Sequence, residues 1–403
     1  MNGCPRHVPA DDVLSYDFHF GETELRNPVA SLDAVRPERR AFFSDKWGGF
    51  WVFTRYEDMR KIAQNPEMFS NQPIGIPPQG YAQRPLIPSE LDPPTHTKYR
   101  HLLSPYFAPG QIRSHEPKIR EVARGLIDGM LETTSCEFIA AFARPLPTRV
   151  FLSLVDFPQS EADRFVSWTH DVMHKRRPED ERERNEARRN ITEFLLEVMQ
   201  ARRAAPGDDL VSYLQDGLID GERISEEALF DTLFQVFLAG LDTVTNTMGF
   251  LIQFLATHAA QRQALLDDPA LLPNALEELL RLHSIVSMTR RVTCDIEFEG
   301  YPLRTGDMVL LPTWSAGRDE AAFDHPLEAD FKRESVRHLA FGAGPHRCLG
   351  SHLARLEMTV ALEELLARMP DIHLDPVGEV KYHGGVLGVD ELPIRYSRAE
   401  MAV

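Results

Sequence analysis

The segment from Leu233 to Ala256 (LFQVFLAGLDTVTNTMGFLIQFLA) constrains this chain more than any other segment. A helix that is so long and so apolar either spans a bilayer or is buried in the core of a large helical protein. Gln235, Asp242 and Asn246 interrupt the segment, and a charged residue near the centre of a membrane span is costly. We therefore expect a core helix over residues 226–258.

The rest of the chain is also predicted to be mainly helical. Helical patterns cover residues 117–129 and 180–203. Strand signals are few and local: one short strand within residues 45–56, and a β-meander over residues 293–313. No repeat or linker divides the chain, so we predict one large helical domain over residues 1–403 with a minor β-meander or sheet region.

Charge and cysteine usage exclude several classes of partner. The formal net charge is −17, which argues against nucleic acid and against an anionic membrane. The N-terminus has no apolar stretch and carries Asp11 and Asp12, so we expect neither a signal peptide nor a membrane anchor. The four cysteines are scattered and lack C-x-x-C spacing, which favours a reducing cytoplasm over a disulfide framework or a structural zinc site.

Cys348 has the sequence context of a metal-bound thiolate. It lies in the run FGAGPHRCLG (residues 341–350), where two glycines and a proline predict a tight loop, and a helical pattern follows at once. The N-terminus of a helix favours a thiolate, and His346 and Arg347 add positive charge nearby. A single thiolate suits haem iron better than zinc or an iron–sulfur cluster. From these residues alone, a buried structural cysteine remains the alternative.

The pattern Phe341-x-x-Gly344-x-His346-x-Cys348-x-Gly350 resembles the haem-binding loop of the cytochromes P-450. The resemblance extends over nearly the whole chain, and it is closest to the soluble bacterial branch that includes the camphor hydroxylase. It implies the P-450 fold, haem b as the cofactor, Cys348 as the axial ligand of the iron, and Phe341 beside the haem.

The run from Ala239 to Thr243 is similar to the oxygen-activation segment of the family. By this resemblance the helix bulges around Gly240 beside the haem, Thr243 holds dioxygen and its waters, and Asp242 gates proton delivery. The residues themselves also allow a paired Asp242 and a Thr243 that bonds to its own helix. Glu278 and Arg281 match the E-x-x-R element of the family, which implies a structural ion pair.

Haem carries two propionates, which need cations or hydrogen-bond donors. Residues that match the family positions for this role are His96, Arg100, Arg290 and His346. Arg291 is adjacent to Arg290 and is the alternative at that position. Solvated surface charges are the other interpretation of these residues.

The resemblance also predicts the residues of a substrate pocket: Ile74, Tyr81, Leu238, Val286, Met288 and Val386. Most of them are apolar, which suits a small, compact hydrophobic substrate such as a terpenoid or norisoprenoid. The tyrosine that binds the ketone in the camphor enzyme has its counterpart near Gln83 or Arg84, and Tyr81 is offset, which argues against camphor. The proline-rich loop from Gln72 to Pro94 is long enough to be a lid or a binding loop.

The related enzymes take electrons from a [2Fe–2S] ferredoxin, and a ferredoxin reductase supplies the ferredoxin with these electrons. Arg60 and Arg100 match basic docking positions, whereas Glu67 and Ser335 depart from them, so we expect a different ferredoxin. The leading hypothesis is a monooxygenase that uses O2 and a small hydrophobic substrate. The alternatives are a peroxygenase or isomerase without an electron partner, a haem sensor, and a hydrolase with Cys348 as its nucleophile.

Overall fold

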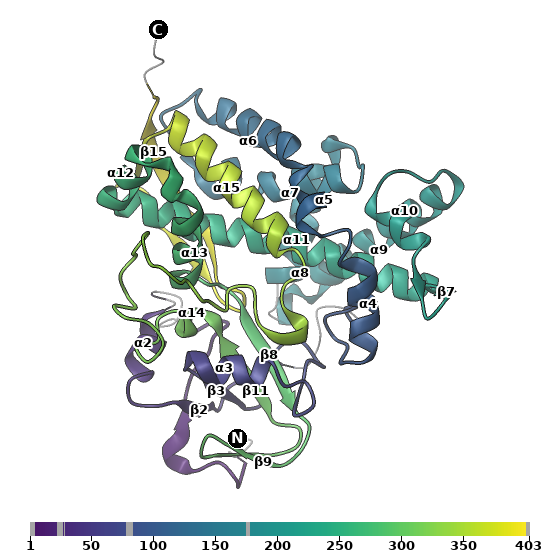
Figure 1. Ribbon diagram of the computed structural model, residues 1–403, viewed down its shortest axis with the longest axis vertical. Helices are drawn as coiled ribbons and strands as arrows, with labels where there is room; N and C mark the ends of the chain where they lie inside the picture. Colours follow the sequence, from purple (N-terminus) through teal and green to yellow (C-terminus); the bar gives the residue numbers. More distant parts are fainter. Residues whose placement is uncertain (1–4, 22–26, 28, 78–83, 175–177, 400–403) are drawn as a thin grey trace.

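The computed structural model describes residues 5–21, 27, 29–77, 84–174 and 178–399. Most helices gather in one half of the molecule, and the main sheet lies at the other end (Figure 1). The long helix α11 (Glu226–Thr257) runs through the middle of the helical half (Figure 1). The prediction of a mainly helical protein with a smaller β part is therefore confirmed.

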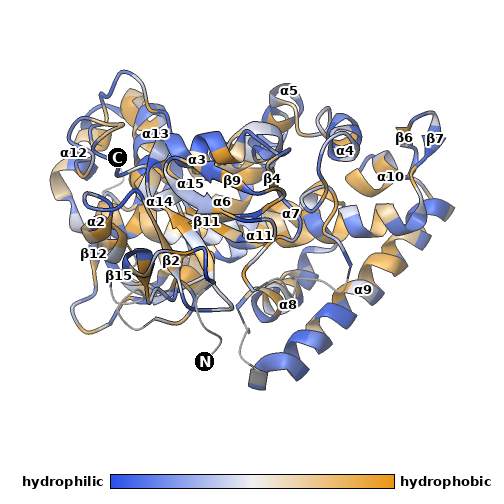
Figure 2. Ribbon diagram, turned by 90° about the horizontal axis from the view of Figure 1, so that it is seen from below, coloured by the Kyte–Doolittle hydropathy of each residue, from blue (hydrophilic) through white to orange (hydrophobic). Residues whose placement is uncertain are grey.

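Helix α11 is held by capping at its start and by burial along its length. The Ser225 side chain accepts a hydrogen bond from the Ala228 backbone N–H, and Glu226 and Glu227 place negative charge in the first turn. Among the described residues α11 is the one helix long and apolar enough to cross a bilayer, but 61% of its most apolar stretch is buried inside the protein. Figure 2 shows it among the other helices of the protein, and most of its residues are buried, as expected of a core helix.

Two apolar clusters meet along α11. Its first half, including Phe237 and Leu241, packs into a cluster with α8, α9 and α10. Its second half, including Met248 and Leu251, packs into a cluster with α6, α13 and α15. The polar residues Asp242 and Thr243 thus lie where the helix passes from one cluster to the other.

The other helices are packed around this axis or cover the sheet. The longer ones are α6 (Glu116–Met130), α7 (Pro145–Leu154), α8 (Ala162–His174), α9 (Glu181–Ala204), α13 (Leu272–Leu282) and α15 (Ser351–Arg368). The shorter ones are α2 (Ala30–Val35), α3 (Tyr56–Ala63), α4 (Thr95–Leu103), α5 (Pro109–Arg113), α10 (Leu210–Gln215), α12 (Ala259–Asp267) and α14 (Thr313–Ala316). Single turns of other helix types are η1 (Ala10–Asp12), η2 (Ile139–Ala143), η3 (Gln159–Glu161), η4 (Pro178–Asp180), η5 (Pro269–Leu271) and η6 (Gly344–His346).

The main sheet joins segments that are far apart in the sequence. Its strand order is β1-β2-β3-β11-β8-β4, with β1 (Val13–Leu14), β2 (Ala41–Ser44), β3 (Phe50–Phe53), β4 (Phe69–Ser70), β8 (Ser287–Val292) and β11 (Met308–Pro312). Strand β11 pairs in parallel with β3, with Val309 opposite Trp51. The expectation that the strands are only local is therefore wrong. Both strands are buried along their whole length, as strands inside a covered sheet are.

The smaller sheets are hairpins and short ladders. They comprise β9 (Ile296–Phe298) with β10 (Tyr301–Leu303), β13 (Lys381–His383) with β14 (Gly388–Glu391), β6 (Leu218–Ile219) with β7 (Glu222–Arg223), and β5 (Ser135–Glu137) with β15 (Pro393–Ser397) and β12 (Asp371–Leu374). The β9–β10 hairpin turns at Glu299 and Gly300, both with positive φ, as a two-residue hairpin turn of type I′ requires.

Candidate active site

The loop before α15 presents Cys348 just ahead of the helix. The Cys348 backbone N–H donates to the Phe341 carbonyl at 2.8 Å, which closes the loop over η6. Gly344 has a φ of +70°, and a Cβ at this position would lie 2.4 Å from the Ala63 carbonyl oxygen. Only glycine fits there, because the loop packs directly against the end of α3.

The thiol of Cys348 is exposed, yet enough protein surrounds it that desolvation raises its pKa. The Gly350 backbone N–H and the charges of Arg100, Arg347 and Arg355 act in the opposite direction. The backbone N–H and the arginines thus favour the thiolate, but their effect on the pKa is smaller than that of desolvation. His346 adds no charge, because burial lowers its pKa to about 3. A metal cation at the sulfur would supply the missing positive charge.

Four predicted donors gather beside the loop without an anionic partner. Arg290 is buried on β8, its side chain donates only to the Thr289 carbonyl at 2.7 Å, and burial lowers its pKa to about 10. The neighbouring Arg291 is exposed, so Arg290 is the inward-facing residue of the two. Burial also lowers the pKa of Arg100. No carboxylate forms an ion pair with either Arg290 or Arg100 in the described part of the chain.

The rings of His96 and His346 lie 4.0 Å apart, between centroids. Nδ1 of His96 and Nε2 of His346 are buried without a hydrogen-bond partner. Burial lowers the pKa of His96 to about 4, so both rings are neutral donors at pH 7. Buried ring nitrogens without partners and guanidinium groups without an anionic partner require an explanation, and a ligand with two carboxylates provides one. The donor set and the lone thiol therefore fit haem b.

A cavity of about 260 Å3 opens between α11, β8 and the proline-rich loop. Five of the six predicted pocket residues line it: Ile74, Leu238, Val286, Met288 and Val386. Thr243, Arg290 and His346 line the same cavity. Tyr81 lies outside the described residues. The lining residues that the sequence did not single out for this pocket include Phe18, His19, Leu86, Met173, Gln235 and Thr289.

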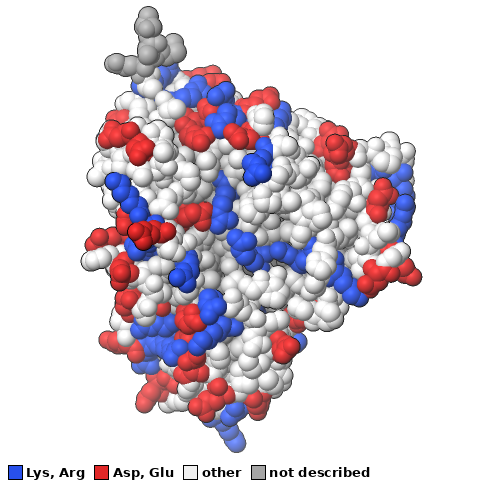
Figure 3. Space-filling view, viewed as in Figure 1, with Lys and Arg blue, Asp and Glu red and all other residues white. Residues whose placement is uncertain are grey.

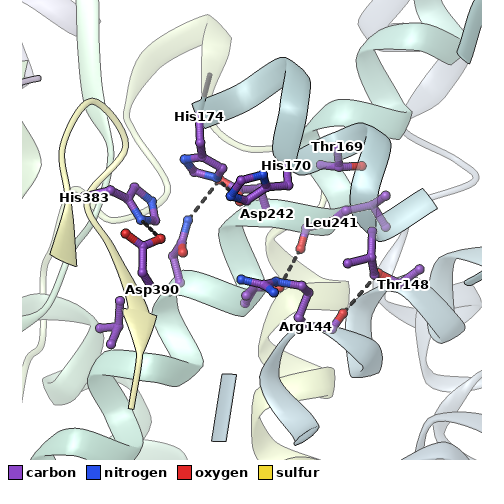
Figure 4. Close-up of a pocket in the computed structure, with 13 residues that line it drawn as sticks. Arg144, Thr148, Thr169, His170, His174, Leu241, Asp242, His383 and Asp390 are labelled. Carbon is purple, nitrogen blue, oxygen red and sulfur yellow. Dashed lines mark hydrogen bonds and ion pairs between the residues drawn. The ribbon is translucent and has the colours of Figure 1, made fainter. Parts of the chain in front are cut away.

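Thr243 and Asp242 do not face the same space. Thr243 lines the large cavity, and its hydroxyl donates to the Ala239 carbonyl at 3.1 Å. Asp242 lines a second, polar cavity of about 20 Å3, shown in Figure 4. The expected bulge at Gly240 is absent, since α11 is continuous there. A Cβ at Gly240 would lie 3.7 Å from the Phe151 ring, so this residue faces helix α7 and not the large cavity.

Asp242 is the centre of a network that the sequence did not reveal. It accepts hydrogen bonds from Nε2 of His174 at 2.7 Å and from Nδ2 of Asn246 at 2.9 Å. Burial alone raises the pKa of Asp242, but the charge and hydrogen bond of His174 lower it to about 2. Figure 4 shows His174, from α8, between Asp242 and His383 on β13, and His383 bonds to Asp390 at 2.8 Å. No local pattern marks these residues, because their partners are distant in sequence.

A family model described as Cytochrome P450 matches residues 164–370. The probable cytochrome P450 127A1 of Sinorhizobium fredii is 36% identical over 407 residues, which covers 98% of this chain and 97% of that protein. The chain belongs to the cytochrome P450 family. The mycinamicin IV hydroxylase/epoxidase of Micromonospora griseorubida is 33% identical to this P450, over 97% of the chain and 98% of the relative.

Solved structures agree with this assignment. The crystal structure of CYP101J2 is similar with a TM-score of 0.89 and 33% identity, over 98% of this chain and all of that chain. That of CYP101C1 has a TM-score of 0.90 and 29% identity, over 98% and 100% of the two chains. The predicted P-450 fold and the likeness to the camphor-hydroxylase branch are thus confirmed. This P450 is a monooxygenase, and its cofactor is haem b.

The E-x-x-R element of this P450 is a fully buried ion pair. Nε and Nη2 of Arg281 donate to Glu278 at 2.8 and 2.7 Å, and Arg333 donates to the same carboxylate. Arg281 also donates to the carbonyls of Pro326 and Glu328. The pair therefore fixes the loop that leads to the cysteine, as a structural role requires.

The face with α15 carries a band of Lys and Arg side chains between α15 and α4 (Figure 3). Burial and the charges of Arg355, Arg347 and Arg113 lower the pKa of His352, so these arginines lie close to one another near Cys348. Arg60, which matches a family docking position, is instead paired with Glu57 at 2.6 Å. Arg355 is likewise paired with Glu277 at 2.6 Å, so Arg113 and Arg347 carry unpaired positive charge near the cysteine loop among the described residues.

Proposed function

We propose that this P450 inserts one oxygen atom from O2 into a C–H bond of a small hydrophobic substrate, of the terpenoid or norisoprenoid kind. We further propose that the electrons come from a [2Fe–2S] ferredoxin and its ferredoxin reductase, and that the enzyme works in the cytoplasm. One observation carries the proposal: Thr243 and the apolar residues share a cavity with Arg290 and His346, which have no anionic partner among the described residues. A mainly apolar pocket with few polar groups selects a hydrophobic ligand.

The haem, when bound, supplies the reduction of dioxygen and the transfer of oxygen to the substrate, with Cys348 as its thiolate ligand. His96, Arg100, Arg290 and His346 would hold its propionates. These residues then orient the cofactor, because each charged hydrogen bond fixes one carboxylate oxygen.

The other residues manage protons and water. The Thr243 hydroxyl donates to the Ala239 carbonyl, so its oxygen is left to accept a hydrogen bond from a water in the cavity. Asp242 stays ionised above its low pKa and is held on the opposite side of α11 by His174 and Asn246. To serve as a proton donor to the large cavity, its side chain has to leave these partners and rotate.

The first test is the absorption spectrum of the dithionite-reduced protein with carbon monoxide, for wild type and for Cys348→Ala. A strongly red-shifted Soret band in wild type alone supports the cysteinate ligand. A band at the position of histidine-ligated haem overturns it. For the proton role, we expect Thr243→Ala to consume reductant and release peroxide, and an unchanged yield of product per reductant would contradict that role.

The orientation of Asp242 favours testing a second route for this monooxygenase, the peroxide-driven reaction that needs no electron partner. An acid turned away from the cavity does not by itself supply protons to dioxygen. Turnover with hydrogen peroxide alone, at a rate equal to that with ferredoxin and reductase, would support this route over the ferredoxin-dependent one.

A further inference from the structure

Gln235 stands out among the residues of the large cavity. It precedes Ala239 and Thr243 by one and two helical turns, so the three side chains form one stripe along α11. All three line the cavity of about 260 Å3. Eight residues of helix correspond to about 12 Å, so Gln235 lines the cavity about 12 Å along α11 from Thr243.

The amide of Gln235 has no hydrogen-bond partner among the residues that the structure describes. Its Oε1 is buried without a hydrogen bond, and its side chain makes no other hydrogen bond to the described residues. Two hydroxyls in the same lining already have protein partners: Thr289 accepts from the Gly75 N–H at 2.9 Å, and Ser287 donates to the Gly385 carbonyl at 3.1 Å. A buried polar group without a partner destabilises the protein unless a ligand satisfies it.

The surroundings of Gln235 limit what this ligand can be. The cavity lining near the middle of α11 is apolar, with Leu238 and Val286. Its positive groups, Arg290 and His346, are those assigned to the propionates. A neutral oxygen atom on an apolar skeleton therefore matches the amide, because the amide can donate to a carbonyl or accept from a hydroxyl.

We propose that Gln235 determines substrate specificity by binding one carbonyl or hydroxyl oxygen of an otherwise hydrocarbon substrate. The oxidised carbon then lies toward Thr243, at the other end of the molecule. This inference rests on the proposed function, since it names the substrate class of the same cavity. A hydrocarbon of the same shape leaves the amide unsatisfied and binds less well.

The test is a thermodynamic cycle on the haem-loaded protein. Dissociation constants of camphor and its parent hydrocarbon bornane, and of β-ionone and its analogue without the ketone oxygen, are measured from the spin-state change of the Soret band. They are compared in wild type, in Gln235→Leu and in Ser287→Ala. The ratio of the two constants within each pair is used, so that differences in hydration between the ligands cancel between proteins.

We expect the preference for the ketone to be about five- to tenfold greater in wild type than in Gln235→Leu. Ser287→Ala should keep the wild-type preference, because its hydroxyl already has a protein partner. Equal preferences in wild type and Gln235→Leu overturn the inference. So does the failure of every compound to bind to wild type that gives the red-shifted carbon monoxide spectrum. The loss of that spectrum, in contrast, would overturn the proposed function itself.

Discussion

The contact between His174 and Asp242 can be tested by its effect on stability. The Asp242 side chain is only 9% exposed, and His174 and Asn246 are its two hydrogen-bond donors within the described chain. Burial raises its pKa, and the charge and hydrogen bond of His174, with the charges of His383 and His170, more than reverse this, from an ordinary value of 3.8 to about 2. Since one pKa unit corresponds to about 1.4 kcal/mol, the ionised carboxylate contributes about 2 kcal/mol to folding.

The sign follows from the lowered pKa in the folded state. The contribution is fully present above about pH 4, where the unfolded carboxylate is also ionised, and it is lost as the pH falls toward 2. At pH 7 we therefore expect His174→Leu to lower the free energy of unfolding by about 2–3 kcal/mol, because it leaves a buried carboxylate with Asn246 alone. His101→Leu, on the exposed side of α4, is the control and should change stability by less than about 0.5 kcal/mol.

The assay is urea denaturation of the haem-loaded protein, followed by circular dichroism, with Asp242→Asn and the double variant completing the cycle. The cost of His174→Leu should fall by about 2 kcal/mol in the Asp242→Asn background. A full and equal cost in both backgrounds would refute the argument, because the histidine would then be stabilising something other than the carboxylate.

Three further predictions address the rest of the site. Arg281→Met leaves the Glu278 carboxylate buried and should cost about 3–5 kcal/mol in urea denaturation, with much of this recovered when Glu278→Gln is added; a cost below about 1 kcal/mol would contradict it. Burial raises the pKa of Glu357 to about 8, so the unfolded chain loses this proton first and wild-type stability falls between about pH 4.5 and 8. The stability of Glu357→Gln relative to wild type should therefore rise by about 2 kcal/mol from pH 5.5 to 7.5, and parallel pH profiles would exclude this. Arg113→Glu should raise the KM for the ferredoxin about three- to tenfold at low salt, whereas Arg395→Glu, on strand β15, should not; equal effects of the two would argue against docking beside the cysteine loop.

Much of the fold and the haem site was predictable because the signals are local. Helices α6, α9 and α11 follow from apolar periodicity, and their ends match the expected ranges within a few residues, while α15 begins directly after the cysteine loop as expected. The cysteine loop contains a glycine that no other residue can replace: a Cβ at Gly344 would clash with the end of α3. The parallel pairing of β3 with β11 was not predictable, because an apolar run indicates a buried strand but does not identify the strand that pairs with it.

The separation of Asp242 from Thr243 is the most informative miss, and elementary geometry explains it. Adjacent residues on a helix point about 100° apart, so Thr243 can line the large cavity while Asp242 lines the polar one, with no irregularity in the helix. The polar character of the two side chains did not reveal that they line different cavities, because either residue type is compatible with the active site. What the sequence lacked was His174, which comes from another helix and holds Asp242 on the opposite side.

This arrangement has a consequence for proton supply. Thr243 is in place in the large cavity, whereas Asp242 reaches that cavity only after it breaks two hydrogen bonds. The energy that His174 contributes to stability is therefore the same energy that opposes rotation of the acid. A variant that weakens this contact, such as His174→Leu, should lose stability and yet release Asp242 for the large cavity. Stability and proton delivery would then change in opposite directions, whereas a purely structural role of Asp242 would leave the yield of product per reductant unchanged.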